Sequence, residues 1–470
     1  MPEKFREQAY RSQMPQLEWP AMPSTSAAYT LALLLQIEDS QWWTPEELLQ
    51  HQLRQLGAML AHAYQQVPLY RKRLDQAGYR PGESVSEESF RCIPTLTRQE
   101  VLDYGTQLDA ASFPKEHGGT HTIRTSGSTG QPVVIKRTAI ALRLLYAISI
   151  RSHRWHNHDF SARIATIRHF RDKPPQPPDG IRLPNWGDPV SPLFHTGDAW
   201  CLDTRSNASE QLDWLLKVNP GYLVTAPSVA ESAAELSLRR GVHPTNLQQV
   251  RTMGETVSDT LRDTVRRAWG VEVADTYSSN EVGHIAIQIP GSERYFVPQE
   301  HVYVELLDAE GRPVASGETG RVVVTPLLNF ATPLIRYEMG DYAELGQASD
   351  CGRGLAVLNR IYGRTRNMLV LPDGDKRFAS FGIKTFNAEH GDRIREYQII
   401  QRRIDSLELT LAMDTPFTPE EEAALLEWIT QWVKYRFHYD VRYVQSIPRS
   451  AAGKFEVFRS EISPGAIDIS

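Results

Sequence analysis

The sequence predicts an α/β protein with a large N-terminal domain and a small α+β C-terminal domain. A chain of 470 residues exceeds one ordinary hydrophobic core. Between about residues 120 and 290, short apolar segments alternate with helical patterns, which predicts strand–helix–strand units and a parallel sheet. The pattern then restarts after Gly363 as a compact α+β unit. We therefore expect domains at residues 1–362 and 363–470.

Residues 44–67 carry the pattern of an amphipathic helix. Thr44 is a plausible N-cap, Pro45 suits the first turn, and Glu46 and Glu47 favour the helix dipole. Leucines follow at helical spacing until Pro68 ends the pattern. We interpret the apolar stripe as core packing.

The middle of the chain predicts a sheet whose strands end in polar residues. A helix over residues 258–269, with Ser258 as its N-cap, separates the last two strands. Ligands of parallel sheets bind beyond the carboxyl ends of the strands, where Gly254-Glu255 and residues 277–281 follow. The predicted strands are residues 163–167, 222–225, 250–253 and 271–276.

The remaining elements are predicted from alternation and turn residues. Residues 173–192 hold seven prolines and predict an irregular excursion. Residues 296–358 alternate as strands, with hairpin connections at residues 308–311 and 316–320. In the C-terminal domain we expect strands at residues 397–402, 407–412 and 441–446, and a helix from Thr418 to about Phe437.

Composition excludes several classes of function. A formal charge of −6 gives no electrostatic reason to expect nucleic-acid binding. The longest apolar run, near residues 27–37, is too short to cross a bilayer, and the charged start of the chain predicts no secretory leader. Cys92, Cys201 and Cys351 are far apart, so they predict no metal cluster and favour a reducing compartment. We expect a cytoplasmic protein without a membrane partner.

Residues 124–132 form the most informative segment, because glycines and hydroxyls gather between two extended stretches. Glycine lets the backbone approach a ligand closely, and a loop of inward N–H groups can wrap a polyphosphate. The segment lacks the Gly-Lys-Ser/Thr ending of a Walker A loop. Taken alone, it is also typical of an ordinary surface turn.

Further polar segments follow this loop in a fixed order. They place Glu281 after a strand, Asp341 in a Gly-Asp turn between strands, Arg364 at the domain junction and Lys454 in a late Gly-Lys turn. Each of them alone has an ordinary structural interpretation.

Together, the ordered segments resemble the adenylate-forming superfamily over essentially the whole chain, and its phenylacetate–CoA ligase branch most closely. Residues 56–71 and 93–98 are similar to the N-terminal region of that branch. The resemblance implies a large adenylate-forming domain of mixed sheets and helices with a small β subdomain. It also implies a small, mobile C-terminal domain that carries the catalytic lysine and rotates between two half-reactions.

The implied chemistry is attack of a carboxylate on the α-phosphate of ATP, which gives an acyl-AMP and pyrophosphate, followed by transfer to the thiol of CoA. By resemblance, Lys454 would bridge the carboxylate and the α-phosphate, and Glu281 would help hold Mg²⁺. Tyr277 would stack on adenine and Asp341 would bind the ribose hydroxyls. The other expected nucleotide contacts are Thr125, Ser126, Gly127, Ser128, Thr129, Gly130, Gly254, Glu255, Ser278, Asn280 and Arg364.

The chain departs from the family pattern at three places. Asn280 stands where the family commonly has Thr, and Arg366 stands at the hinge position, which is usually Asp or Lys. Residues 371–378 form a hairpin-like substitute for the loop beside the pantetheine tunnel, more like capsule-biosynthesis relatives. Adenylation is therefore better supported than transfer to CoA.

The acid itself is not legible in the sequence. The branch favours aryl acids, and a flat apolar pocket could be built from aromatic residues, while His195 and Glu255 could recognise a polar substituent. The aromatic candidates, each also an ordinary core residue, are Tyr146, Trp155, Phe170 and Tyr222.

Three functional hypotheses follow. The first is an ATP-dependent, AMP-forming acid–CoA ligase. The second passes the acyl group to a carrier-protein thiol or an amine. The third is a nucleotide-binding protein without catalysis, which the joint presence of Glu281, Asp341 and Lys454 disfavours. A homodimer is an expectation from resemblance alone.

Overall fold

The computed structural model describes residues 10–125, 131–170, 172–364, 368–373, 376–378, 381–391, 393–448, 455 and 457–462. The chain divides into two compact units, residues 1–361 and 362–470, each of which is considered by itself.

The first unit begins with a helical region in which local signals and packing agree. The predicted helix is α2 (Pro45–Gln66), which starts with a capping box between Thr44 and Glu47 and ends before Pro68. Its buried face joins the largest core cluster through Leu56, Met59 and Leu60. The neighbouring helices are α1 (Thr25–Ser40), α3 (Pro68–Gln76), α4 (Glu87–Arg91) and α5 (Arg98–Tyr104), followed by the 3₁₀ turns η2 (Gly105–Leu108) and η3 (Lys115–His117).

Twelve strands of the described residues form one sheet, in the order β11-β12-β13-β14-β10-β9-β8-β7-β6-β3-β5-β4. The strands from β5 through β3, β6 and β7 to β8 are parallel, which confirms the predicted parallel sheet. β9 runs antiparallel to β8, so β8 is the boundary between the two halves. The bounds are β3 (Ile164–Arg168), β4 (Ile181–Leu183), β5 (Ala199–Asp203), β6 (Tyr222–Thr225), β7 (Gln249–Met253), β8 (Glu272–Ser279), β9 (Gly283–Gln288), β10 (Tyr295–Phe296), β11 (Val302–Leu307), β12 (Thr319–Pro326), β13 (Tyr337–Leu345) and β14 (Val357–Arg364).

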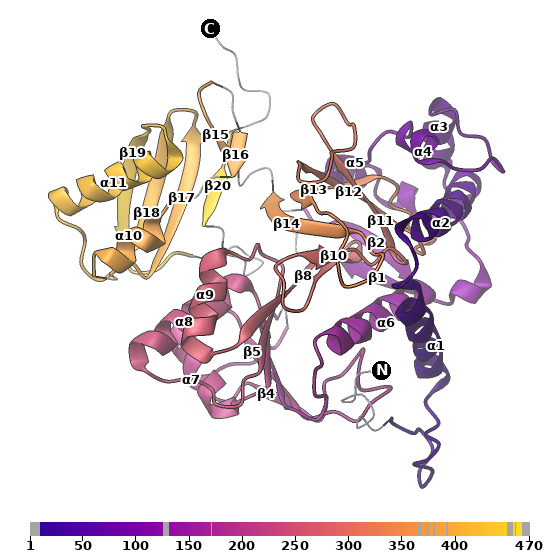
Figure 1. The fold of residues 1–470 in the computed structure, drawn as a ribbon, viewed down its shortest axis with the longest axis horizontal. Helices are drawn as coiled ribbons and strands as arrows, with labels where there is room; N and C mark the ends of the chain where they lie inside the picture. Colours follow the sequence, from indigo (N-terminus) through magenta and orange to yellow (C-terminus); the bar gives the residue numbers. More distant parts are fainter. Residues whose placement is uncertain are drawn as a thin grey trace. The chain divides into compact units, whose positions relative to one another are not determined.

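Helices cover both faces of the parallel half. Figure 1 shows α7 (Ala208–Val218), α8 (Pro227–Arg240) and α9 (Asp259–Trp269) on one side, and α6 (Ala139–Trp155) on the other. Ser258 caps α9 as predicted, its side chain accepting a hydrogen bond from the backbone N–H of Leu261. One core cluster joins Leu223 and Val250 of the strands to these helices, while α6 packs in a second cluster with Ile287 and Phe296. The side chains of β7 that point toward α6 are therefore enclosed between that helix and the backbone of the sheet.

A separate hairpin flanks the glycine- and hydroxyl-rich loop. β1 (Thr120–Arg124) and β2 (Val134–Thr138) pair antiparallel, with Arg124 opposite Val134. Residues 308–311 and 316–318 lie between β11 and β12, while Thr319 and Gly320 belong to β12, so the second predicted connection does not join two separate strands. Its residues lead directly into β12 instead.

The second unit contains a hairpin and a four-stranded sheet. β15 (Met368–Val370) and β16 (Lys376–Phe378) pair antiparallel, so the expected hairpin is present but begins at Met368 rather than within residues 371–378. The described sheet has the order β19-β18-β17-β20, with β17 (Glu396–Arg403), β18 (Ser406–Ala412), β19 (His438–Val444) and β20 (Phe458–Ser460). α10 (Ile383–Glu389) and α11 (Pro419–Val433) supply its helices. α11 ends four residues earlier than predicted because Lys434 adopts a left-handed conformation with φ of 50°.

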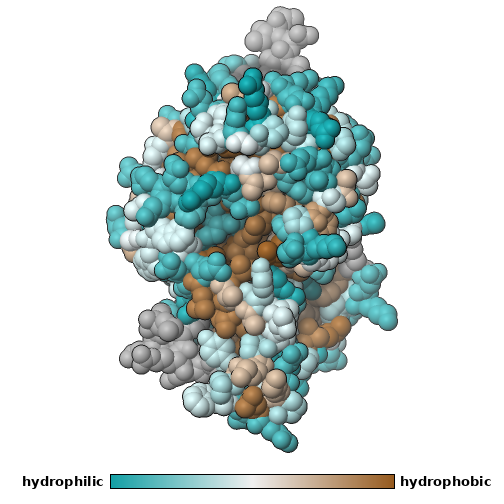
Figure 2. Space-filling view, turned by 90° about the vertical axis from the view of Figure 1, so that its right-hand side faces the viewer, coloured by the Kyte–Doolittle hydropathy of each residue, from teal (hydrophilic) through white to brown (hydrophobic). Residues whose placement is uncertain are grey.

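The surface of the chain mixes polar and apolar side chains. Figure 2 shows teal and brown atoms interspersed, with a brown band across this face. Within the residues that are described, none of the helices combines the length and the apolar character needed to span a lipid bilayer.

Candidate active site

The carboxyl end of β8 carries several of the predicted residues. Tyr277 and Ser278 belong to the strand itself, so the expectation that they follow it was wrong; β8 extends to Ser279 because β9 pairs with it. Asn280 and Glu281 lie in the turn between β8 and β9. The turn sits at the boundary between the parallel and antiparallel halves of the sheet.

Arg137 of β2 donates two hydrogen bonds to this turn. One terminal nitrogen, Nη2, donates to the backbone carbonyls of Asn280 at 2.8 Å and of Glu281 at 3.1 Å. Arg137 is 7% exposed, and burial lowers the pKa of its guanidinium to about 10, so the group stays charged at neutral pH. Arg137 was not among the residues predicted from the sequence.

Glu281 forms a salt bridge with Arg98, the first residue of α5. Arg98 Nη1 lies 3.0 Å from Glu281 Oε1, and the carboxylate side chain is 9% exposed. The other terminal nitrogen of Arg98 lies 3.4 Å from Thr125 Oγ1 and 3.4 Å from the carbonyl of Gln131. Arg98 therefore contacts both flanks of the glycine- and hydroxyl-rich loop and the carboxylate that follows β8.

Asp341 lies within β13, which corrects the prediction of a turn between strands. The Gly-Asp pair sits instead where the register of β12 and β13 shifts, and Gly340 has φ of 74°, as a β-bulge allows. Tyr277 Oη donates to Asp341 Oδ2 at 2.7 Å. The bulge therefore places the predicted adenine and ribose contacts side by side.

The Gly254-Glu255 segment follows β7 as predicted. Gly254 has φ of 87°, which favours glycine, and nothing lies within 4 Å of the position where a Cβ would stand. Glu255 Oε2 accepts a hydrogen bond from the backbone N–H of Ser228, in the first turn of α8, at 3.0 Å. A carboxylate there complements the helix dipole, so Glu255 has a structural contact of its own.

Several predicted residues lie outside the described part of the chain. They are Ser126, Gly127, Ser128, Thr129, Gly130, Arg366 and Lys454. Arg364 ends β14, and only its backbone is described. Thr125, next to the loop, is buried, and its hydroxyl accepts from the N–H of Val133 at 2.9 Å.

The aromatic residues considered for an acid pocket each have different contact partners. Trp155 packs against Phe296 in the core, and Tyr146 donates to Asp188. Tyr222 is 2% exposed and lies beside His158 on the α6 side of the sheet. Phe170 stacks with Arg168, and His195 is exposed.

A buried polar layer between α6, β7 and β9 was missed by the sequence analysis. Three residues of α6 and its C-cap residue recur at helical spacing, which is the signal that would have revealed the layer: Ser149, Ser152, His153 and His156. Arg251 of β7 lies 2.9 Å from both ring nitrogens of His153 and 3.2 Å from Ser152 Oγ. His284 of β9 bonds Ser149 at 2.8 Å.

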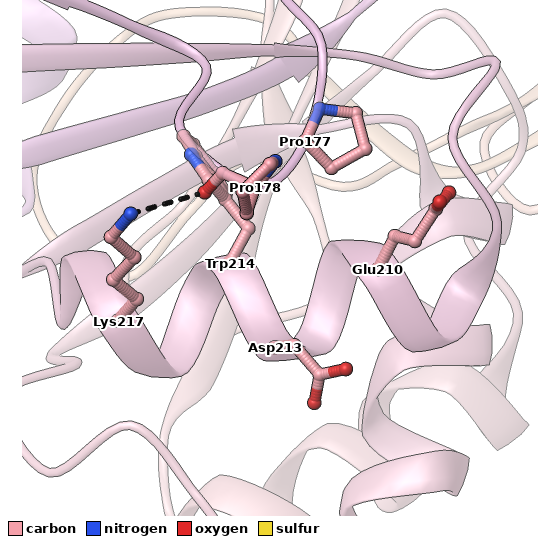
Figure 3. Close-up of a pocket in the computed structure, with 6 residues that line it drawn as sticks. All are labelled: Pro177, Pro178, Glu210, Asp213, Trp214 and Lys217. Atoms are coloured by element: carbon pink, nitrogen blue, oxygen red, sulfur yellow. Dashed lines mark hydrogen bonds between the residues drawn. The ribbon is translucent and has the colours of Figure 1, made fainter.

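Two cavities lie elsewhere in the first unit. A space of about 380 Å³ beside α7 is lined by Pro177, Pro178, Glu210, Asp213, Trp214 and Lys217. Figure 3 shows Lys217 donating to the carbonyl of Pro178 there. A second cavity of about 300 Å³ lies between α2 and the antiparallel strands. Neither is lined by a predicted site residue.

Metal binding at this site would depend on one protein carboxylate. Among the residues with described positions, no group of three or more His, Cys, Asp or Glu is arranged to hold an ion. Mg²⁺ is commonly held through one or two carboxylates together with substrate phosphates and water. Glu281 fits that pattern, because it supplies one largely buried carboxylate, which is paired with the more exposed Arg98.

Known proteins are similar to this chain over much of its length. Residues 373–461 match the family model of the CapK C-terminal domain. A phenylacetate-coenzyme A ligase of Thermus thermophilus is 25% identical over 394 residues, covering 80% of this chain and 83% of the relative. One from Escherichia coli is 26% identical over 69% of this chain and 73% of the relative.

Solved structures give the same fold. A 2-hydroxyisobutyryl-CoA ligase in the postadenylation state, bound to an acyl-AMP, has a TM-score of 0.71 at 19% identity, covering 89% of this chain and 90% of the other. An anthranilate CoA ligase bound to anthranoyl-AMP has a TM-score of 0.51 at 17% identity, covering 71% of this chain and 65% of the other.

The chain is similar in sequence to these ligases and shares the fold of the solved structures, in agreement with the resemblance to the adenylate-forming superfamily. The predicted fold class is confirmed.

Proposed function

We propose that this protein is an ATP-dependent carboxylic acid ligase, which forms an acyl-AMP and pyrophosphate and then a CoA thioester. The relatives named phenylacetate-coenzyme A ligase span most of both chains, which supports this reaction class. The single observation that carries the proposal is the arrangement at the end of β8. There the Glu281–Arg98 pair lies next to Thr125, and Tyr277 is bonded to Asp341.

Each described residue has a task in this reaction. Tyr277 presents an aromatic ring for the adenine, while its hydroxyl orients the Asp341 carboxylate that would accept from ribose hydroxyls. Arg98 and the charged Arg137 surround Glu281 with positive charge close to the loop expected to hold the phosphates. Mg²⁺ held through Glu281 would neutralise phosphate oxygens when bound. Catalysis then rests mainly on positioning and electrostatics.

Lys454 completes the proposal from the C-terminal unit. A lysine ammonium suits the space between the attacking carboxylate and the α-phosphate, where negative charge accumulates. Its role, the hinge at Arg366 and the nucleotide contacts of residues 126–130 remain predictions, as does a homodimer.

A second candidate for the molecule that accepts the acyl group is considered because residues 373–461 match the CapK C-terminal domain. The adenylation half-reaction would be unchanged, but the acyl group would pass to a carrier-protein thiol or an amine. Product analysis with and without CoA separates the two. Absence of a CoA thioester from every acid that is activated would favour the second acceptor.

Acid-dependent exchange of pyrophosphate into ATP tests the proposal. We expect exchange with a subset of aryl and aliphatic acids, and its loss in Lys454→Ala. The matched control is Lys72→Ala, which removes an exposed lysine of α3. A folded protein that never cleaves ATP between the α- and β-phosphates, whatever the acid, would refute it.

A further inference from the structure

The imidazoles of the buried polar layer form a hydrogen-bonded chain with one direction. His158 Nε2 lies 2.6 Å from Gln249 Oε1, an oxygen that can only accept, so this nitrogen carries the proton. His158 Nδ1 must then accept from His153 Nδ1, 2.7 Å away, which leaves His153 Nε2 as an acceptor for Arg251. A neutral ring allows each of these assignments.

The hydrogen-bond directions beyond Gln249 are determined in the same way. Gln249 Nε2 donates to His156 Nδ1 at 3.2 Å, and His156 Nε2 donates to the carbonyl of Gln288 at 3.2 Å. Burial and the nearby Arg251 lower the pKa of His156 to about 4 and that of His158 to about 2. The histidines are therefore uncharged at neutral pH and do not add to the charge of Arg251.

Arg251 is left as the only charge that the polar layer contains among the described residues, and no described carboxylate pairs with it. Burial lowers its pKa only to about 10, so the guanidinium stays protonated. A largely buried charge is unfavourable unless an opposite charge compensates it. The neutral imidazole of His153 and the hydroxyl of Ser152 accept hydrogen bonds from the two terminal nitrogens of Arg251, but neither group carries a charge that would balance the guanidinium.

The polar layer is continuous with the candidate active site. His284 is the register partner of Ser278, which precedes the Glu281 turn. Arg137, which holds that turn, and Arg251 both lower the pKa of His284, together with burial, to about 4. Along β7, Gln249 and Arg251 are partly buried and Met253 is 45% exposed, so the layer opens toward Gly254 at the end of the strand.

A second observation indicates a ligand. Ser149 Oγ donates to the carbonyl of Leu145, so it accepts from His284 Nε2. The other nitrogen, Nδ1, is then an acceptor; it is buried and has no hydrogen-bond partner among the described residues. A buried unsatisfied acceptor is unfavourable, and a hydroxyl or N–H group of a bound molecule would satisfy it.

We propose that Arg251 determines specificity by binding an anionic group at the far end of the acid substrate, so that the preferred substrate carries a second negative charge. This inference rests on the proposed acid-activating function. The reacting carboxylate lies toward Glu281 and the distant anion lies in the polar layer, beside Ser152 and His153. A bidentate guanidinium is well suited to a carboxylate.

Pyrophosphate exchange by the wild-type protein with matched acids provides the first test. Adipate is compared with hexanoate, and 4-carboxyphenylacetate with phenylacetate, because each pair differs only in the distant carboxylate. We expect kcat/KM to be at least about tenfold higher for one or both diacids than for the matched monoacid. A preference for the monoacid in both pairs would overturn the inference and leave the proposed function intact.

Variants provide the second test. Arg251→Met should raise the KM of the diacid at least about tenfold, with kcat changed much less, and keep the KM of the monoacid within about twofold. Arg251→Lys should retain part of the preference. Arg182→Met, which removes an exposed guanidinium on the edge strand β4, is the matched control.

The outcomes separate a specificity role from a structural one. An equal rise in KM for diacid and monoacid in a folded Arg251→Met protein would overturn the inference. If that variant does not fold, the wild-type comparison decides. Absence of exchange with every acid would refute the proposed function, and the inference would fall with it.

Discussion

Arg98 and Glu281 form a 3.0 Å salt bridge that joins the start of α5 to the turn after β8, across 183 positions of sequence. Arg98 also reaches Thr125 and the carbonyl of Gln131. The pair therefore connects the three segments from which a polyphosphate site would be built.

Replacement of Arg98 is expected to weaken ATP binding. Arg98→Met should raise the KM for ATP by about tenfold or more, because a charge near the phosphates and the partner of Glu281 are both lost. Arg98→Lys should recover part of the effect. Initial rates of pyrophosphate exchange at varied ATP provide the measurement. An exposed arginine, Arg312, gives the control variant Arg312→Met. A KM unchanged by Arg98→Met would contradict the assignment.

Glu281→Gln should lower kcat for exchange by about a hundredfold or more, since the amide keeps the shape but removes the charge expected to hold Mg²⁺. Titration with Mg²⁺ at fixed ATP should also show a higher half-saturating concentration. Glu310→Gln, at an exposed position between β11 and β12, is the control. Full activity in Glu281→Gln would exclude a role in metal binding.

The bond between Tyr277 and Asp341 predicts a coupled effect on ribose recognition. Asp341→Asn should raise the KM for ATP, and Tyr277→Phe should raise it by a smaller factor, because the ring remains. The wild-type protein should bind an ATP analogue that lacks one ribose hydroxyl less tightly than it binds ATP. The Asp341→Asn variant should bind the analogue and ATP equally well. Additive losses from the analogue and the variant would show that Asp341 does not contact the ribose.

Acid should destabilise the first unit through its buried histidines. His156 and His284 have folded pKa values of about 4, against an ordinary value of 6.5, because burial and Arg251 disfavour their charged forms. The unfolded chain therefore binds more protons between pH 6.5 and 4, and stability falls as the pH falls through that range. Each group contributes a slope of up to about 1.4 kcal/mol per pH unit.

Urea denaturation across this range tests the slope. His156→Gln should flatten it by up to one proton, since Gln can keep a donor and an acceptor. His243→Gln, at an exposed position, should leave it unchanged. An identical slope in the wild-type protein and His156→Gln would rule out this origin of acid sensitivity.

The buried ion pair of Arg336 is expected to affect the stability of the fold and not the reaction. Its guanidinium pairs with Glu305 at 2.9 Å and donates to the carbonyls of Arg91 and Ile93, and both charged side chains are almost fully buried. Glu305→Gln leaves the guanidinium without its counter-charge, so we expect about 3–5 kcal/mol lower stability. Thermal denaturation provides the measurement. A loss below about 1 kcal/mol would show that water or the carbonyls suffice.

Local signals explain most of the elements predicted correctly. The Thr44 capping box and Pro68 fixed both ends of α2, and Ser258 fixed the start of α9. The errors have long-range causes. β8 extends past Thr276 because β9 pairs with it, and Asp341 lies in a bulge of β13 because β12 supplies the opposite strand. No pattern local to those residues contains this information.

The candidate site was only partly predictable for the same reason. Glu281, Tyr277 and Asp341 were predicted from motifs, and the structure brings Tyr277 and Asp341 into contact. Arg98, Arg137 and Arg251 were missed because their significance depends on partners far away in sequence. The polar spacing on α6 was visible, but an apolar helix with serines and histidines has many ordinary explanations.

The one-way chain of imidazoles also constrains how this protein can change over evolutionary time. Exchanging Gln249 for a residue that only donates would reverse the proton on His158, then on His153, and would set an N–H against the guanidinium of Arg251. One substitution at Gln249 therefore alters both of the rings that lie between it and Arg251. In homologous chains we expect Gln249, His158 and His153 to vary as a set. Sequence divergence around the far end of the acid substrate would then proceed in concerted steps.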